Sequence, residues 1–467
     1  MRRFLILILI LVTVPSFAQE AITEVLRFDE YLGFVKRFHP VTKQAELIID
    51  EGQAELIRAR GGFDPKLEVD FDRKAFKSLT YYDRLNATFK VPTWYGIELQ
   101  ANFEQNEGDF LNPEATLPVD GLYSAGISIS VAQGLLINKR MAALKQARFF
   151  REQVKADRDL AVNQVLYEAS LAYFNWIQAY SQYEIYNQFL ENARIRFEGI
   201  KQSVIVGERA AIDSVEAGIT YQNRQLNLEK ARLELIKRRL EVSNFLWLDN
   251  YIPVELQDNV IPAVNADDQV DIALNIDGFS EIDFQIENHP KLQSLEYKYR
   301  SLEINRRLKA NMLLPQVDLM YNFLSETPRT ANSFNVANYK SAVRVAFPLF
   351  LRKERGDLKL AKLKLQDVEL EINATELQLK NKINAVQTAI NSYATQTELN
   401  GRIVEDYQTM LSAEERKFGI GESSLFLVNS RETKLIEARL KAAELQNEYL
   451  SAKALLFNSL ALNPDFE

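Results

Sequence analysis

Apolar residues recur at spacings of three and four over four long stretches of the chain, and this period predicts α-helices. The two longest stretches run from Asn138 to Val206 and from Arg355 to Gly419, and neither contains a proline. Two shorter stretches run from Ile212 to Trp247 and from Leu425 to Leu460. A helix of about 67 residues is roughly 100 Å long, which is too long for the interior of a compact domain.

A glycine separates each long stretch from the shorter one that follows it, Gly207 in the first half and Gly421 in the second. Glycine readily takes the left-handed conformation that ends a helix, so each pair of stretches is predicted to form a helical hairpin with the glycine at its tip. Two further helices are expected at Pro40 to Arg60 and Pro290 to Met312, because proline is favoured in the first helical turn. Placed end to end with the shorter hairpin helices, they match the longer ones in length.

Between the helical stretches, apolar and polar residues alternate with a period of two, which predicts β-strands. The alternating runs cover residues 67–72, 123–130, 317–323 and 342–347. Each run is about long enough for a membrane-spanning strand with one face toward lipid and the other toward a lumen. A half-buried sheet of a soluble protein gives the same pattern. The long helices leave no evident soluble core for the strands to cover, and this favours a closed barrel shared by several chains.

Residues 39–248 reappear, weakly but in the same order, as residues 289–462. Val206, Gly207 and Glu208 correspond to Ile420, Gly421 and Glu422 at an offset of 214, whereas Asp64 corresponds to Leu314 at an offset of 250. The difference, 36 residues, is an insertion confined to the strand region of the first copy. It holds two more alternating runs, 85–91 and 95–103, which either extend the wall of the barrel or lie outside it.

The repeat divides the chain into four parts. We expect a signal peptide at 1–18, a first repeat at 19–250, an equatorial linker at 251–285 and a second repeat at 286–467. The signal peptide is indicated by the basic start, the apolar stretch from Phe4 to Val14 and the small-residue exit at Ala18. That apolar stretch, about 11 residues, is short of the roughly 20 that a membrane helix needs.

The composition excludes several kinds of chemistry. The chain has no cysteine, which rules out disulfides, thiolate catalysis and cysteine-bound zinc. With 64 acidic and 56 basic residues and no basic tract, a nucleic-acid partner is not expected. His39 and His289, the only histidines, each precede a helix-starting proline, where a capping or packing role is expected. No catalytic motif, cofactor site or metal site is found, so no enzyme activity is predicted.

The order of these features resembles the TolC-like outer-membrane efflux proteins, also called outer membrane factors. The features are the signal peptide, the duplicated unit, the glycine tips, and an apolar strand, a turn and a basic residue at Val131 to Arg140 and at Val345 to Arg355. The resemblance implies a mixed α and β membrane protein with two internal repeats, assembled as a homotrimer. About four strands from each chain would close a transmembrane β-barrel in the outer-membrane lipid, and long antiparallel hairpins would form an α-barrel in the periplasm.

The same resemblance implies a passive exit duct of a tripartite efflux or type I secretion system, without a cofactor. A periplasmic adaptor (membrane fusion protein) and an inner-membrane pump of the RND, ABC or MFS class would be its partners. An exported coiled-coil structural or adhesion protein without a channel is the alternative, and it would be extracted without detergent.

In this family the hairpin tips carry the adaptor contacts and the closing gate. By position, the resemblance implies adaptor contacts at ten residues: Val206, Gly207, Glu208, Ala211, Asp213, Ile420, Gly421, Glu422, Ser424 and Leu425. Some members narrow the closed tip with aspartates about two turns after the second glycine. This chain has Leu427, Asn429 and Ser430 there, so a polar or apolar pore constriction is expected in place of an acidic one.

Overall fold

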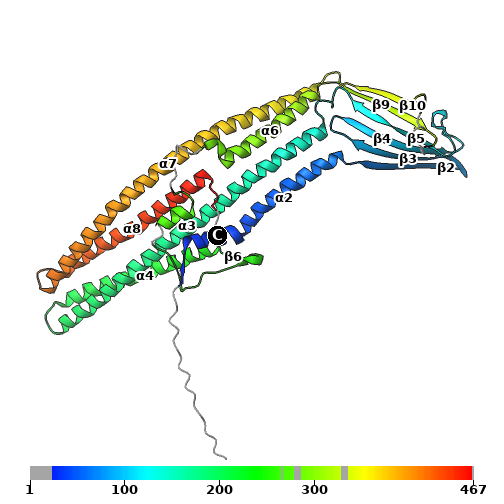
Figure 1. The fold of residues 1–467 in the computed structure, drawn as a ribbon. Helices are drawn as coiled ribbons and strands as arrows, with labels where there is room; N and C mark the ends of the chain where they lie inside the picture. The colour runs from blue at the N-terminus through cyan, green and yellow to red at the C-terminus, as the bar shows by residue number, and fades with distance from the viewer. Residues whose placement is uncertain (1–23, 265–266, 278–284, 328–334, 465–467) are drawn as a thin grey trace, which may run out of the picture.

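The computed structural model describes residues 24–264, 267–277, 285–327 and 335–464, so the predicted signal peptide lies outside the described residues. The molecule is elongated, with the tips of two helical hairpins at one end and a β-sheet at the other (Figure 1). Within the described ranges, no helix combines the length and the apolar character that a membrane span requires.

The four long helices predicted from the period are present. They are α3 (Lys139–Ile205), α4 (Ala211–Ser243), α7 (Arg352–Gly419) and α8 (Leu425–Leu460). Helix α4 ends before Trp247, where the period had placed its end, because Trp247 pairs with Pro253 in a small sheet. That sheet consists of β6 (Trp247–Leu248) and β7 (Ile252–Pro253).

The two proline-initiated helices are also present, as α2 (Pro40–Arg60) and α6 (Pro290–Asn311). Both histidines cap them as expected: Val41 N donates to His39 Nδ1 at 3.3 Å and Lys291 N donates to His289 Nδ1 at 3.1 Å. Helices α2 and α4 both pack along α3, one after the other, and α6 lies between α3 and α7 (Figure 1).

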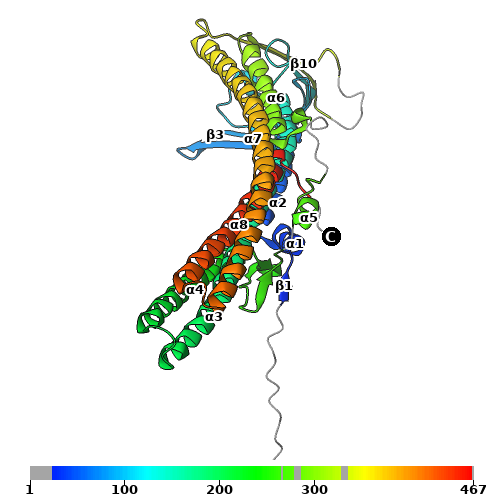
Figure 2. The same ribbon diagram turned by 90° about the vertical axis from the view of Figure 1, so that its left-hand side faces the viewer.

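A single antiparallel sheet holds six strands in the order β10-β9-β5-β4-β3-β2. Their bounds are β2 (Lys66–Phe76), β3 (Leu79–Pro92), β4 (Ile97–Glu107), β5 (Leu122–Ser130), β9 (Gln316–Ser325) and β10 (Tyr339–Ala346). The expectation of about four strands is therefore wrong. The inserted residues form β3 and β4 inside the sheet, because their apolar positions alternate in phase with those of β2 and β5. Figure 2 shows that the sheet is curled, with β3 and β10 on opposite sides of the long helices.

The largest apolar core lies midway along the helices, where α3 and α8 meet α1 (Phe28–Phe38) and α5 (Asp267–Ala273). Neither short helix was predicted. The hydroxyl of Tyr173 on α3 donates to Leu26 O at 2.6 Å and accepts from Ala263 N at 3.2 Å. These bonds tie the parallel pair of β1 (Glu24–Leu26) and β8 (Val260–Pro262) to the long helix, so residues before and after the first hairpin are fixed at one level.

The capping histidine of α6 makes the stability of the fold dependent on pH. His289 is only 3% exposed, and burial lowers its pKa from 6.5 to about 4. As the pH falls, His289 therefore takes up a proton at a higher pH in the unfolded chain than in the folded chain. The free energy of unfolding should be highest above pH 6.5 and should fall toward pH 4, by at most about 3 kcal/mol from this residue.

Urea unfolding of the detergent-purified protein at pH 7.5 and pH 4.5 measures this loss. In His289→Asn the amide oxygen can still cap the helix but does not titrate, so this part of the pH dependence should disappear. His39→Asn is the matched control, because His39 is less buried. An unchanged pH dependence in His289→Asn would contradict the assignment.

Candidate functional site

The two hairpin tips have the same backbone geometry. Gly207 and Gly421 take φ values of +81° and +82°. At the first tip, the N–H groups of Gly207 and Glu208 donate to Val204 O and Ser203 O at 3.1 and 2.9 Å. The second tip has the same pair of bonds at the same spacing, to Phe418 O and Lys417 O. This is the Schellman motif, which ends a helix at a left-handed residue, so both glycines are required by the turn itself.

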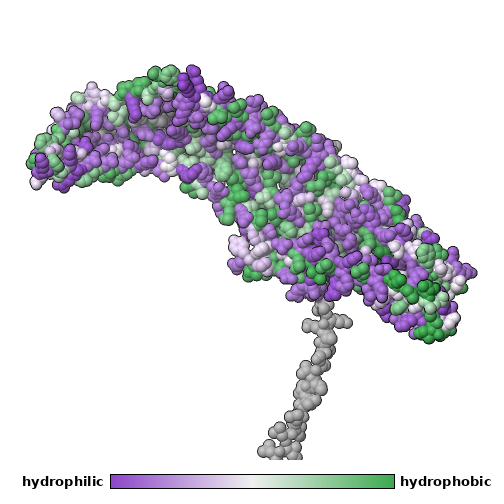
Figure 3. All heavy atoms as spheres, turned by 180° about the vertical axis from the view of Figure 1, so that it is seen from behind, coloured by the Kyte–Doolittle hydropathy of each residue, from purple (hydrophilic) through white to green (hydrophobic). Residues whose placement is uncertain are grey.

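Most of the residues expected to contact an adaptor are exposed at these tips. Val206 and Ile420 are 66% and 72% exposed, and the neighbouring Ile212 and Phe426 are 67% and 68% exposed. Hydrophobic residues gather at this end of the molecule in the space-filling view (Figure 3). Among the expected contacts, Gly207, Glu208, Ala211, Gly421, Glu422 and Ser424 are exposed as well, and Asp213 is partly exposed.

The two tips are held against each other within one chain. The guanidinium of Arg209 lies 4.3 Å from the centre of the Phe418 ring and 3.8 Å from the carboxylate of Asp213. Leu425, at 4% exposure, packs with Ile200 and Ala217 in an apolar cluster between the hairpins. Leu425 is thus brought to the tips but points into the chain, unlike the other expected contacts.

The three residues expected to narrow the pore lie in the first two turns of α8. Leu427 and Ser430 are exposed, whereas Asn429 is half-buried. The amide of Asn429 donates to Glu216 Oε1 at 3.4 Å and to Thr220 Oγ1 at 3.3 Å, both on α4. Asn429 therefore links the two hairpins, while Leu427 and Ser430 remain open to solvent in the single chain.

A buried cluster of charges behind the tips was missed in the sequence. Glu432 of α8 is fully buried and forms a hydrogen-bonded ion pair with Arg196 of α3. Its second carboxylate oxygen lies 3.7 Å from Arg224 Nε of α4. The alternating charges along these helices suggested solvated faces. The signal was the position of Glu432, four residues after Val428 and three before Leu435, inside the apolar stripe of α8.

This cluster joins all four long helices. Besides Glu432, Arg196 reaches Glu415 of α7 at 3.2 Å, and Arg224 donates to Thr433 Oγ1 at 3.2 Å. Burial lowers the pKa of Arg224, and the opposing charge of Glu432 offsets this in part. Because a buried ion is stable only beside its partner, the three charges hold the two hairpins in one relative position.

The sheet at the other end has two chemically distinct faces. Along the observed registers, one face carries apolar side chains on all six strands, among them Val69, Phe89, Leu99, Ile127, Tyr321 and Val343. The other face carries polar side chains, including the ion pairs Lys90 with Glu68 at 2.7 Å and Arg84 with Asp72 at 3.3 Å. Both inserted strands share these faces with their neighbours.

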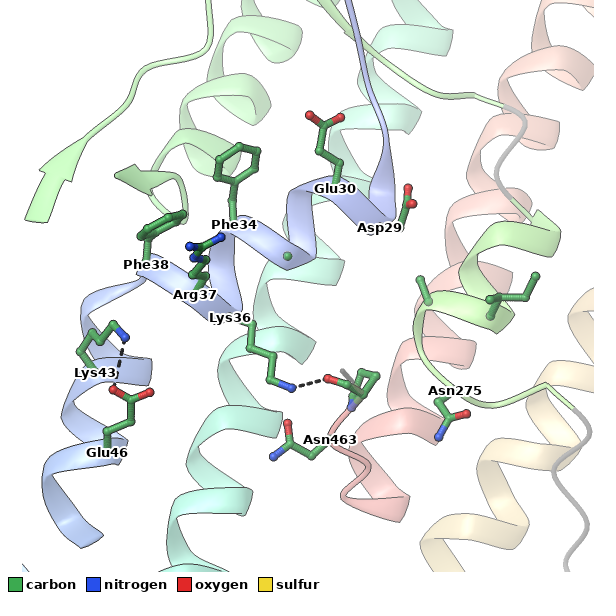
Figure 4. Close-up of a pocket in the computed structure, with 14 residues that line it drawn as sticks. Asp29, Glu30, Phe34, Lys36, Arg37, Phe38, Lys43, Glu46, Asn275 and Asn463 are labelled. Carbon is green, nitrogen blue, oxygen red and sulfur yellow. Dashed lines mark hydrogen bonds and ion pairs between the residues drawn. The ribbon is translucent and has the colours of Figure 1, made fainter. Parts of the chain in front are cut away.

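A cavity of about 1130 Å³ lies beside α1, α2 and the carboxyl-terminal segment (Figure 4). Lys36 donates to Pro464 O at one wall, and Lys43 pairs with Glu46 at another. Acidic and basic groups are interspersed around it, so it favours no one ligand charge. In the ranges that the structure describes, no three His, Asp or Glu side chains cluster as metal ligands would.

The sequence was compared with protein families and with curated proteins. Residues 282–462 match the family described as outer membrane efflux protein. This part of the chain is similar to that family. The resemblance to the TolC-like efflux proteins is thereby confirmed. No curated protein sequence matches the chain.

Solved structures of similar fold cover nearly the whole chain. The Campylobacter jejuni CmeC outer membrane channel has a TM-score of 0.66 at 14% identity, covering 93% of this chain and 85% of that one. The Vibrio cholerae outer membrane protein VceC has a TM-score of 0.65 at 14% identity, with coverages of 93% and 96%. The open state of the Neisseria gonorrhoeae MtrE outer membrane channel gives 0.64 at 12%, with 93% and 89%. The described chain therefore shares the fold of these channels from sheet to tips.

The buried cluster yields a prediction about stability. Glu432→Leu leaves the buried guanidinium of Arg224 without an ion pair, whereas Arg196 keeps Glu415. It should lower the free energy of unfolding by about 3 kcal/mol or more, measured by urea unfolding in detergent. Replacing Arg196, Arg224 and Glu432 together by methionine should recover most of this loss, because no unpaired buried charge remains.

Glu437→Leu is the matched control on the same helix. Its exposed pair with Lys434, at 2.8 Å, should contribute little to stability, because solvent screens the two charges. Equal losses in Glu432→Leu and Glu437→Leu would show that the buried cluster does not hold the hairpins together.

Proposed function

We propose that this protein is the outer-membrane exit duct of a tripartite efflux or type I secretion system, acting as a passive homotrimeric channel. The observation that carries the proposal is the separation of surfaces: a two-faced sheet at one end and exposed apolar tips at the other, joined by long helices (Figure 1). The match of residues 282–462 to the efflux family supports it.

The sheet has the properties of a membrane wall. Its strands have 8 to 14 residues, comparable to the roughly 9 to 11 that a tilted membrane strand needs. Aromatic pairs lie on the apolar face at the end remote from the helices, with Phe103 and Tyr123 4.7 Å apart and Tyr321 and Tyr339 5.3 Å apart. At the helical end, Trp94 stacks on Phe63 at 5.6 Å. Aromatic residues at both borders of an apolar band are typical of barrels in the outer membrane.

The tips are proposed as the docking surface for a periplasmic adaptor, which connects the duct to an inner-membrane pump of the RND, ABC or MFS class. Exposed apolar residues at Val206, Ile212, Ile420 and Phe426 would be covered by that partner. In this proposal the energy for transport comes from the pump. The pore would narrow at Leu427, Asn429 and Ser430.

The two repeats, 19–250 and 286–467 around the linker 251–285, would give a trimer pseudo-sixfold order and place six tips at one level. The coiled-coil scaffold is the weaker proposal. A scaffold of that kind has no use for a sheet whose apolar face extends over six strands.

Membrane fractionation tests the proposed function. The protein should sediment with the outer membrane, need detergent for extraction, and show a trimer by native mass measurement. Release of a folded monomer in buffer without detergent would favour the scaffold and refute the duct.

The tip glycines provide a second test. Gly207→Val or Gly421→Val forces a branched residue to a positive φ at a cost of roughly 1 kcal/mol or more per site, although the added atoms meet nothing within 4 Å. The distorted turns should reduce export of a pump substrate and adaptor binding, with the trimer intact.

Gly199→Val and Gly401→Val are the matched controls for this test. Both glycines lie in open space on the same long helices, without a positive φ. Export that is normal in the tip variants, or equally reduced in the controls, would count against tip docking.

A further inference from the structure

The six-stranded sheet has two unpaired edges. Within the described residues, β2 and β10 each hydrogen-bond to one neighbouring strand only, and every residue of both strands is exposed. An open edge with exposed apolar side chains is unstable next to lipid, because its N–H and C=O groups have no water to bind. The edges therefore require a partner strand.

Strand direction identifies how two copies of this chain would meet. All neighbours in the sheet are antiparallel and the number of strands is even, so β2 and β10 run in opposite directions. Under a rotation that carries one copy onto the next, β10 of one copy faces β2 of the other in antiparallel sense. Identical copies can thus close a ring without a parallel junction.

The internal repeat supplies the register of this junction. Within the chain, the last strand of the first repeat, β5, pairs with the first strand of the second repeat, β9, placing Ser130 opposite Asp318 and Ile129 opposite Leu319. The sequence offsets of 214 and 250 map Ser130 onto Arg344 and Asp318 onto Glu68. The equivalent junction between copies therefore places Arg344 opposite Glu68.

We propose that β10 of one copy pairs antiparallel with β2 of a second copy, with Arg344 opposite Glu68, Lys340 opposite Asp72 and Val343 opposite Val69. The inference rests on the proposed trimeric duct, and it assigns that trimer an 18-stranded barrel, six strands from each chain. The apolar and polar faces of β2 and β10 continue across the junction without a break.

The charges of the two edges favour this register over its neighbours. Cross-strand pairs of opposite charge stabilise a sheet and like charges directly opposite destabilise it. A slip of two residues one way puts Arg344 opposite Lys66, and a slip of two the other way puts Lys340 opposite Lys74. A slip of one residue exchanges the two faces of the sheet.

The carboxylates at the junction are already arranged for such pairs. In the single chain, Glu68 is bonded to Lys90 and Asp72 to Arg84, so both lie on the polar face beside the open edge. Arg344 has no ion pair within 4.0 Å among the described residues, and Lys340 reaches Glu104 at 3.5 Å. The junction would extend these pairs into rows of alternating charge around the lumen.

Cysteine cross-linking tests the register, since the chain has no native cysteine. Val343→Cys is combined in turn with Leu67→Cys, Val69→Cys and Phe71→Cys in the full-length protein, oxidised in outer membranes and separated without reductant. The pair with Val69→Cys should give the most covalent trimer. A link within one chain is excluded, because five strand spacings, about 24 Å along the sheet, separate the two positions.

Ile129→Cys with Leu319→Cys is the matched control, because it joins the equivalent β5 and β9 positions inside one chain. The test is valid if this control forms its disulfide and the trimer is intact. The proposed register is then wrong if Val343→Cys forms no cross-link, or if its cross-linking is strongest with Leu67→Cys or Phe71→Cys. If native mass measurement of the cysteine-free protein shows no trimer, the proposed duct fails as well. The two failures are thus distinguishable.

Discussion

The structure depends on one constraint: a backbone N–H or C=O group in lipid must find a partner in the protein, since no water is there to replace it. A sheet of six strands with one apolar face cannot meet that constraint alone, because β2 and β10 remain open. Association of several chains is therefore a condition for the sheet to lie in a membrane. The exposed apolar residues on both edge strands continue the apolar face of the sheet to its margins.

The helical end meets a different requirement, which is to hold long helices in fixed relative positions far from any sheet. Ridges of apolar residues supply most of the contact along α3 and α7, but apolar contacts allow helices to slide. The cluster of Arg196, Arg224 and Glu432 adds a directional constraint near the tips, since the hydrogen bond from Arg196 to Glu432 forms in only one alignment of the helices. The left-handed glycines then set where each helix turns back.

Much of this fold could be predicted from the sequence. The spacing of apolar residues and the prolines and glycines that start or end helices are local properties of the chain. The helix starts at Pro40 and Pro290 and the turns at Gly207 and Gly421 follow from the backbone preferences of single residues. The place of the inserted strands could not be predicted, because alternation shows that a run is a strand but not which strands are its neighbours. Helix α1 was missed because its apolar face is stabilised by packing against Tyr173 and Phe174, which are distant in sequence.

Some residues of the candidate site could likewise be predicted from the sequence, and others could not. Tip residues such as Val206 and Ile420 could be found because the glycine turn beside them is a local signal. Leu425 could not be separated from them, since its burial depends on the packing of the other hairpin. Glu432 resembled the surface carboxylates around it, and only its place in the apolar stripe distinguished it.

The two additional strands in the sheet bear on where passage through such a duct is limited. The diameter of a barrel grows roughly in proportion to its strand number, so a wall of 18 strands is about half as wide again as one of 12. The helical part gains nothing from the insertion, which lies in the strand region and adds β3 and β4 to the sheet. The duct would then be funnel-shaped, with a broad mouth facing the exterior, and the size of the cargo would be decided at the narrow periplasmic end.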